Sequence, residues 1–164
     1  MKINTLPPPH STHYDSNGND SITENQKITV ITISFNAVSD IERTILSVIN
    51  QSYFDIEYLV IDGGSTDGTV NIIEKYNDRI TAWLSESDKG VYDAMNKGIR
   101  MATGRWILFM NSGDTFHDNK VVEDIFKETY PDHVGVIWGD TDFYNKEHFV
   151  SKSVKTPFTK TIMA

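Results

Sequence analysis

Short apolar runs alternate along this chain with segments in which apolar residues recur every three or four positions. The first run lies in residues 27–36, and its β-branched and aromatic side chains are typical of a strand. Ser39 and Glu42 then predict a capping box at the start of a helix. The apolar residues behind them share one helical face: Ile41, Ile45, Val48 and Ile49. The predicted fold therefore opens with a strand, a polar loop and a helix.

The same unit repeats further along the chain. Residues 56–61, 80–84 and 105–110 are apolar runs that suit buried strands, and a polar loop follows each of them. The helical patterns between these runs are carried by Val70, Ile72, Ile73 and Tyr76, and then by Val91, Met95 and Ile99. Strands that alternate with helices, without hairpin signals, predict right-handed crossovers and a parallel sheet. The fold class is therefore α/β, with a mostly parallel sheet flanked by helices in three layers.

The pattern is less regular after residue 114. Residues 121–130 are predicted to be helical, and Val134–Trp138 is predicted to be a strand. Residues 141–150 form either a strand or a hairpin around Asn145 and Lys146.

Residues 1–26 differ in composition from the rest of the chain. They contain the run Pro7–Pro9 followed by a stretch dominated by Asn, Asp, Ser and Gly. Such a segment buries too little apolar surface to offset its ordering entropy. We predict a disordered extension over residues 1–26, with a partner-binding arm as the alternative, and one domain over residues 27–164.

Composition and charge narrow the class of protein. The 164 residues suffice for one domain, and a net charge of -8 argues against nucleic acid as a partner. The chain has no cysteine, which fits a reducing compartment. No apolar run reaches the roughly 18 residues of a membrane span. We therefore expect a cytoplasmic location.

Polar loops follow each predicted strand, after Phe35, Ile61, Leu84 and Met110. In a parallel sheet the carboxyl ends of the strands lie at one edge, where open α/β sheets bind ligands. We therefore expect these four loops to converge on one crevice.

The loop at residues 111–114 follows the last of these strands and ends in the carboxylate of Asp114. A lone carboxylate there suits Mg²⁺ or Mn²⁺ whose other ligands are phosphate oxygens and water. The alternative is an aspartate that holds a turn or caps the next segment.

The loop that begins at Asp62 is rich in glycine. The Asp62 carboxylate could accept a hydrogen bond from a nucleotide base or a ribose hydroxyl; alternatively it ties down the glycine turn. Thr66 and Asp67 are interpreted as helix caps. The loop lacks the Gly-Lys-Ser/Thr ending of a phosphate loop and the Gly-x-Gly-x-x-Gly pattern of dinucleotide binding.

The segment from Asp88 to Gly98 is unusually polar for the start of a helix. Asp88 is either a site residue or an N-cap. Lys89 and Lys97 are the candidates for phosphate charge, with a solvated surface as the alternative for each. The five histidines show no ligand spacing.

These four loops together resemble those of the family 2 glycosyltransferases, whose GT-A fold binds nucleotide sugars. Residues 60–69, Val-Ile-Asp-Gly-Gly-Ser-Thr-Asp-Gly-Thr, look like the family's Asp-x-Gly-Ser-Thr-Asp-Gly-Thr signature, and residues 111–114 occupy the place of its Asp-x-Asp metal motif. The sequences of residues 62–69 and 88–98 look most like those of the transferases that build bacterial capsules and exopolysaccharides. The resemblance covers residues 27–150.

The resemblance assigns roles to individual residues. It implies nucleotide contacts for Ser34, Asn36, Asp62, Asp88 and Lys89, and metal binding for Asp114. The sequence departs from the family pattern at Gly63, Asn111 and Gly113, so that one carboxylate remains for the metal.

The implied reaction is the inverting, metal-assisted transfer of a sugar from a nucleoside diphosphate sugar, most simply a UDP-sugar, to a hydroxyl acceptor. The acceptor would be a saccharide or a lipid-linked saccharide in polysaccharide biosynthesis. The resemblance is also compatible with a homodimer and with peripheral attachment of the full-length protein to the inner face of the plasma membrane. A nucleotidyltransferase and a non-catalytic nucleotide-binding module are the alternatives.

The catalytic base is not identified by the sequence. In the family the acceptor-side segment and the base follow well after the metal motif, and the present chain ends at Ala164, so we expect a truncated transferase that binds nucleotide without turnover. Asp140, at the end of a predicted strand, is kept as the alternative base.

Overall fold

The computed structural model describes residues 26–127, 130, 134–137, 141–145 and 148–153. The chain divides into two units, Met1–Lys127 and Glu128–Ala164. The predicted N-terminal extension lies outside the described residues except for Gln26, as does Asp140.

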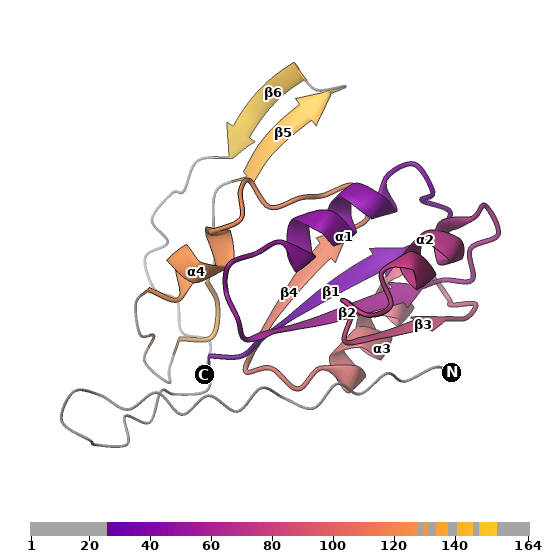
Figure 1. Cartoon of the computed structure of the whole chain (residues 1–164), viewed down its shortest axis with the longest axis horizontal. Helices are drawn as coiled ribbons and strands as arrows, with labels where there is room; N and C mark the ends of the chain where they lie inside the picture. Colours follow the sequence, from indigo (N-terminus) through magenta and orange to yellow (C-terminus); the bar gives the residue numbers. More distant parts are fainter. Residues whose placement is uncertain (1–25, 128–129, 131–133, 138–140, 146–147, 154–164) are drawn as a thin grey trace. The chain divides into compact units, whose positions relative to one another are not determined.

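The first unit is built on four parallel strands in the order β3-β2-β1-β4 (Figure 1). The strands are β1 (Ile28–Ser34), β2 (Ile56–Asp62), β3 (Ala82–Ser85) and β4 (Trp106–Asn111). Each pair is in register, so that Ser34 lies beside Asp62, Asp62 beside Ser85, and Ile33 beside Asn111. The predicted parallel sheet is confirmed.

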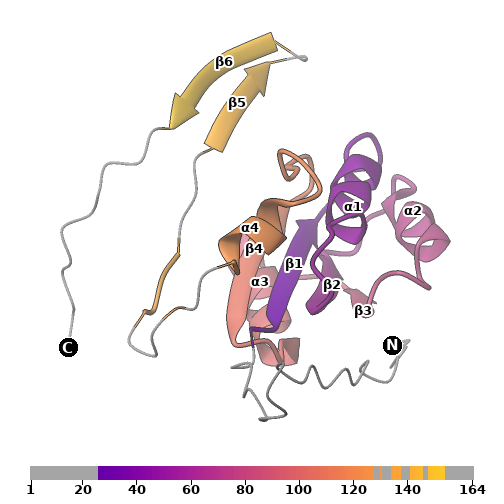
Figure 2. The same ribbon diagram turned by 60° about the vertical axis from the view of Figure 1, so that its left-hand side comes forward.

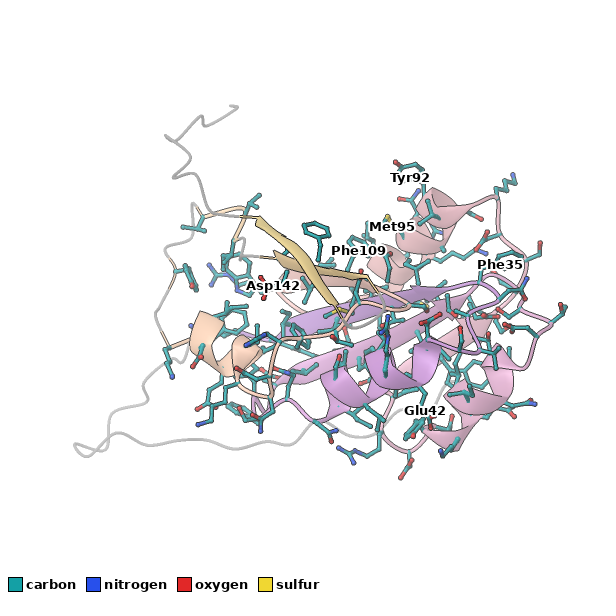
Figure 3. All side chains as sticks on the ribbon, turned by 90° about the horizontal axis from the view of Figure 1, so that it is seen from above. Phe35, Glu42, Tyr92, Met95, Phe109 and Asp142 are labelled. Carbon is teal, nitrogen blue, oxygen red and sulfur yellow. The ribbon has the colours of Figure 1, made fainter. Side chains whose placement is uncertain are left out.

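Helices cover both faces of this sheet. They are α1 (Ile41–Ile49), α2 (Thr69–Lys75), α3 (Val91–Met101) and the short α4 (Val121–Ile125). Helices α1 and α2 lie on one face and α3 on the other (Figures 1 and 2). In Figure 3 Glu42 of α1 accordingly lies on the opposite side of the sheet from Tyr92 and Met95 of α3. The three-layer prediction is confirmed.

The core explains why these strands are so apolar. All seven residues of β1 are buried, as are six of the seven in β2. On the α3 face the helix approaches the sheet through Ala94 and Gly98, and a Cβ on Gly98 would meet Ile31 at 2.6 Å. Val91 and Ile99 share a helical face as predicted, but they are exposed at 47% and 46%. The sheet is therefore approached by Ala94 and Gly98, and Met95, the third residue of the predicted face, packs beside them with Met101.

Glu57 ties together the amino-terminal edge of the sheet. Its carboxylate accepts the hydroxyls of Thr29 and Thr103 and the backbone N–H of Thr103, at 2.6 to 2.7 Å. Lys27 adds an ion pair at 3.4 Å. This cluster joins β1, β2 and the turn before β4. It lies at the edge of the sheet opposite the carboxyl ends of the strands, where the ligand crevice was predicted.

Two predictions about the elements are wrong, and a third gives a helix too great a length. Helix α1 has Asp40 at its N-cap with no side-chain cap, because the Ser39 hydroxyl donates to Asp40 and Glu42 accepts from Lys75 and Tyr76. Val134–Ile137 is not a strand, and Trp138 lies outside the described residues. The helix predicted from residue 121 ends at Ile125 and is followed by a turn at 126–127.

The second unit contains a hairpin of β5 (Thr141–Asn145) and β6 (His148–Ser153), paired antiparallel. The hairpin alternative for this segment is thereby confirmed. No helix in the described part of the chain is both long and apolar enough to cross a membrane.

Candidate functional site

The four strand ends bring the polar loops to one edge of the sheet, as the sequence predicted. Ser34, Asp62 and Ser85 end three neighbouring strands, and the loop after β4 is joined to β1 through Ser112. The Ser112 N–H and hydroxyl both donate to the carbonyl of Ile33, at 3.1 and 3.0 Å. These contacts place the loops after β1, β2, β3 and β4 side by side.

Asp62 organises the glycine-rich loop. Its carboxylate accepts the N–H groups of Gly64 and Ser65, the Ser65 hydroxyl at 2.5 Å and the Ser85 hydroxyl at 2.6 Å. The residue is 0% exposed. Asp62 therefore ties down the turn, which is the alternative that the sequence left open, and it also joins the ends of β2 and β3.

The loops after β1 and β2 are joined reciprocally. The Asn36 N–H donates to the Ser65 hydroxyl at 2.7 Å, and the Thr66 N–H donates to the Asn36 side-chain oxygen at 3.0 Å. Asn36 has a φ of 47°, in the left-handed region that asparagine tolerates better than most residues. Asparagine suits this pair of hydrogen bonds, because its side-chain oxygen accepts one of them and its backbone tolerates a positive φ.

Asp67 fastens the same two loops further from the strand ends. Its carboxylate accepts the hydroxyl and N–H of Thr69 and the N–H of Val38. The Thr69 hydroxyl above all, with these N–H groups, holds the pKa of Asp67 below its usual range. Asp67 thus accepts the first N–H group of α2, that of Thr69, but the N-cap residue is Gly68 and the helix has no side-chain cap. The predicted capping role of Thr66 is not observed, since its N–H donates to Asn36.

Asp88 lies against the glycine-rich loop. Its Oδ1 accepts the Gly90 N–H at 2.8 Å, and its Oδ2 stands 2.6 Å from where a Cβ on Gly63 would be. The carboxylate is partly exposed. The structure therefore brings Asp88 against Gly63, the residue that follows Asp62, although Asp88 comes from the loop after the next strand.

Lys97 is not a free cation. Its ammonium lies 3.0 Å from Glu86 and 3.6 Å from Asp93, and it donates to the Ser87 carbonyl at 3.2 Å. The side chain is 12% exposed. Lys97 therefore holds the loop before α3, whereas Lys89, whose N–H donates to Asp93, is exposed.

The Asp114 carboxylate is exposed, and its one described side-chain contact is a long hydrogen bond of 3.5 Å from the Asn111 amide. Among the described residues no group of three or more His, Cys, Asp or Glu side chains could hold a metal ion. An accessible single carboxylate still fits Mg²⁺ or Mn²⁺ when a diphosphate and water complete the coordination. The donor set suits a cation that is shared with a nucleotide.

Burial divides the predicted site residues into two groups. Ser34 and Asp62 are buried, and the Ser34 hydroxyl has no hydrogen-bond partner among the described residues. Asn36, Lys89 and Asp114 are exposed, and Asp88 is partly exposed. The second group can meet a ligand directly. In the first group, Asp62 holds the loops through its carboxylate, and Ser34 does so through its carbonyl, which accepts the Gly63 N–H at 2.9 Å.

Two residues at this edge were missed by the sequence analysis. Phe35 is 65% exposed where β1 ends, beside Gly63 (Figure 3). Thr44 of α1 contacts the loop of Asp114. The signal for Phe35 was a large apolar residue just past the buried strand. A cavity of about 150 Å³ at the far end of α1, lined in part by Val48 and Tyr58, contains none of the predicted site residues.

The chain is similar to known glycosyltransferases. The profile of the glycosyl transferase family 2 matches residues 29–163. An uncharacterized glycosyltransferase of Mycobacterium tuberculosis is 45% identical over 96 residues, which cover 58% of this chain and 37% of that protein. The putative teichuronic acid biosynthesis glycosyltransferase TuaG of Bacillus subtilis is 36% identical over 101 residues, 60% of this chain and 40% of that protein. The chain thus spans less than half the length of these relatives.

Solved structures give the same fold. The structure of S. aureus TarS 1-349 in complex with UDP-GlcNAc is similar with a TM-score of 0.55 and 27% identity, over 60% of this chain and 30% of that chain. A mannosyltransferase from Pyrobaculum calidifontis, in complex with GDP-Man and Mn²⁺, has a TM-score of 0.55 at 24% identity, over 59% of this chain and 30% of that one. The second likeness shows the fold alone.

Proposed function

This chain belongs to glycosyl transferase family 2, and on that basis we propose that it forms the donor-binding part of an enzyme that transfers a sugar from a UDP-sugar to a hydroxyl acceptor. One observation carries the proposal. The ends of four parallel strands bring Asn36, Asp62, Asp88 and Asp114 to the same edge of one sheet. That edge is where open α/β sheets bind nucleotides.

The exposed residues of this edge suit a nucleoside diphosphate. Phe35 offers a flat apolar surface for a base, and aromatic stacking contributes about 1–3 kcal/mol per base. Asn36 and Asp88 offer hydrogen-bonding groups next to it, and the Lys89 ammonium is available for phosphate. UDP is supported by the likeness to TarS, whose complexes contain UDP and UDP-GlcNAc.

Asp62 and Ser34 act in this proposal as positioning residues. The resemblance assigned both to nucleotide contact, but both are buried, and Asp62 already accepts four hydrogen bonds. Asp62 would fix the glycine-rich loop, on which the base and ribose would rest, through its carboxylate. Ser34 would do so through its carbonyl, which accepts the Gly63 N–H at 2.9 Å.

Asp114 would hold Mg²⁺ or Mn²⁺ together with the diphosphate of the donor. When bound, such an ion neutralises the negative charge that builds on the leaving diphosphate. Because this chain supplies one carboxylate, cation and nucleotide should bind cooperatively. The acceptor oxygen would attack the anomeric carbon from the side opposite the diphosphate, and the configuration at that carbon would invert as the bond to the diphosphate breaks. A general base would take the acceptor proton.

A thermal-shift panel tests this proposal. UDP, GDP, CDP and dTDP, together with UTP and CTP, are compared in Mn²⁺ and in EDTA. We expect stabilisation by UDP that increases with Mn²⁺, since a ligand that binds only the folded state raises its stability. Stabilisation by the triphosphates alone would favour a nucleotidyltransferase, and no stabilisation by any nucleotide would overturn the proposal.

A further inference from the structure

Helix α1 carries a row of polar side chains that hold the segment after β4. The row consists of Thr44, Ser47 and Gln51, spaced three and four positions apart, so they lie on one side of the helix and its end. Ser47 accepts the Phe116 N–H at 3.4 Å. Gln51 donates to the Asp118 carbonyl at 2.6 Å and accepts the Val122 N–H at 3.1 Å. The segment that begins with Asp114 is therefore laid along α1.

Thr44 makes the contact nearest to Asp114. Its hydroxyl accepts the Gly113 N–H and donates to the Asp114 carbonyl, both at 2.9 Å. The residue is 0% exposed. One hydroxyl thus holds both ends of a two-residue unit, in which Gly113 has a φ of +103° that glycine adopts without strain.

The other contacts of Asp114 constrain the orientation of its carboxylate only weakly. Its N–H donates to the Asn111 carbonyl at 2.9 Å, which closes the turn. Its carboxylate is exposed and, among the described residues, accepts one hydrogen bond, from the Asn111 amide at 3.5 Å. The orientation of the carboxylate therefore depends on where the backbone is held, and Thr44 holds it on the side of α1.

We propose that Thr44 is a positioning residue for the divalent cation and the donor diphosphate at Asp114. This inference rests on the proposed function. A site with several carboxylates tolerates the displacement of one of them, but here one carboxylate serves the cation. Loss of the Thr44 hydroxyl should therefore weaken the cation-dependent part of nucleotide binding and leave the cation-independent part, which depends on the loops after β1, β2 and β3.

The experiment compares the wild type with Thr44→Val, Thr44→Cys, Thr44→Ser and Ser47→Ala. UDP affinity is measured by calorimetry in Mn²⁺ and in EDTA, and the ratio of the two is the gain due to the cation. Thermal melts report folding separately. Thr44→Val removes both hydrogen bonds at similar volume, Thr44→Cys keeps a weak donor and acceptor, and Thr44→Ser keeps the hydroxyl. Ser47→Ala is the matched control on the same helix face.

Thr44→Val should reduce the gain about tenfold, the lower range for residues that orient a metal ligand. Thr44→Cys should fall between it and the wild type, and Thr44→Ser and Ser47→Ala should keep the gain. If Thr44→Val does not fold, the Thr44→Cys variant decides. A reduced gain in Thr44→Cys supports the proposal, and an unchanged gain in Thr44→Cys overturns the proposal.

Two further outcomes would overturn the inference. One is a folded Thr44→Val with the gain of the wild type. The other is an equal loss in Mn²⁺ and in EDTA, which would mean a general loosening of the site. A wild type that binds no UDP, or that gains nothing from Mn²⁺, would instead remove the proposed function or its metal part, and the inference with it.

Discussion

The Oδ2 atom of Asp88 lies 2.6 Å from the position that a Cβ atom on Gly63 would occupy. The loops after β2 and β3 therefore approach each other so closely that a Cβ at position 63 would displace the Asp88 carboxylate. The next glycine is constrained in a different way. Gly64 has a φ of +85°, and a Cβ there would stand 3.2 Å from the Ser87 backbone nitrogen.

The two glycines predict different results on substitution. Gly63→Ala should fold, because the displaced group is the end of a side chain, but it should weaken UDP binding by roughly 1 kcal/mol, the typical value of one hydrogen bond. Gly64→Ala should lower the free energy of unfolding by about 1–2 kcal/mol, because a non-glycine residue is strained at positive φ. Urea unfolding and calorimetry measure both. Unchanged UDP binding in Gly63→Ala would contradict the part given to Asp88.

Asp62→Ala should reduce both stability and nucleotide binding. The substitution leaves the donors of Gly64, Ser65 and Ser85 without their acceptor, which costs about 1–3 kcal/mol for buried groups. UDP binding should weaken as well, equally in Mn²⁺ and in EDTA, because the glycine-rich loop loses the carboxylate that holds it. Asp62→Asn, which keeps one side-chain oxygen, is the control, and its stability and UDP affinity should lie between those of the wild type and Asp62→Ala. A loss confined to the Mn²⁺-dependent part would show that the roles of Asp62 and Asp114 are wrongly divided.

The sequence predicted the strands and the edge of the site because both depend on local patterns. The apolar runs of β1 and β2 are stable only in a sheet that is covered on both faces. In a parallel sheet the loops that follow the strands lie at the same edge, so their proximity follows from the topology alone. The identity of Asp62, Asp88 and Asp114 as residues of one edge followed from position alone.

The tasks of these residues could not be predicted, because they depend on distances between loops. Nothing local reveals that Lys97 is held by Glu86, Asp93 and Ser87, or that Thr44 reaches residue 114. The capping box failed for a similar reason. Glu42 fits the local pattern, but Lys75 and Tyr76 of α2 are close enough to take its carboxylate.

The cluster at Glu57 predicts a dependence of stability on pH. Burial alone would raise the pKa of Glu57, but hydrogen bonds from Thr29 and Thr103 and the charge of Lys27 outweigh it and hold the pKa below the ordinary value of 4.5. The unfolded chain therefore binds the proton more tightly than the folded protein does. The stability from this group is complete above the unfolded pKa and is lost as pH falls through the folded one.

Glu57→Gln should accordingly show a smaller loss of stability than the wild type between about pH 6 and pH 3. Burial raises the pKa of the neighbouring Asp55, which contributes with the opposite sign and is present in both proteins. Urea unfolding across this range measures the difference. Parallel pH profiles for the two proteins would mean that Glu57 is not the titrating group.

Deletion of residues 1–25 should leave the melting temperature nearly unchanged. Their composition, with Pro7–Pro9 and a polar stretch behind it, provides little apolar surface for the core. Differential scanning calorimetry of the full and shortened chains tests this. A drop of several degrees would indicate that the segment docks on the domain, as the partner-arm alternative implies.

The central claim is that the edge formed by the ends of β1, β2, β3 and β4 binds a nucleoside diphosphate, with a divalent cation held at Asp114. The most direct measurement is calorimetric titration of UDP into the wild type and Asp114→Asn, each in Mn²⁺ and in EDTA. We predict that the wild type binds UDP in EDTA and binds it more tightly in Mn²⁺, and that Asp114→Asn keeps the first affinity and loses the increase. A wild type that binds no UDP, or an Asp114→Asn variant that keeps the full increase in Mn²⁺, would contradict the account.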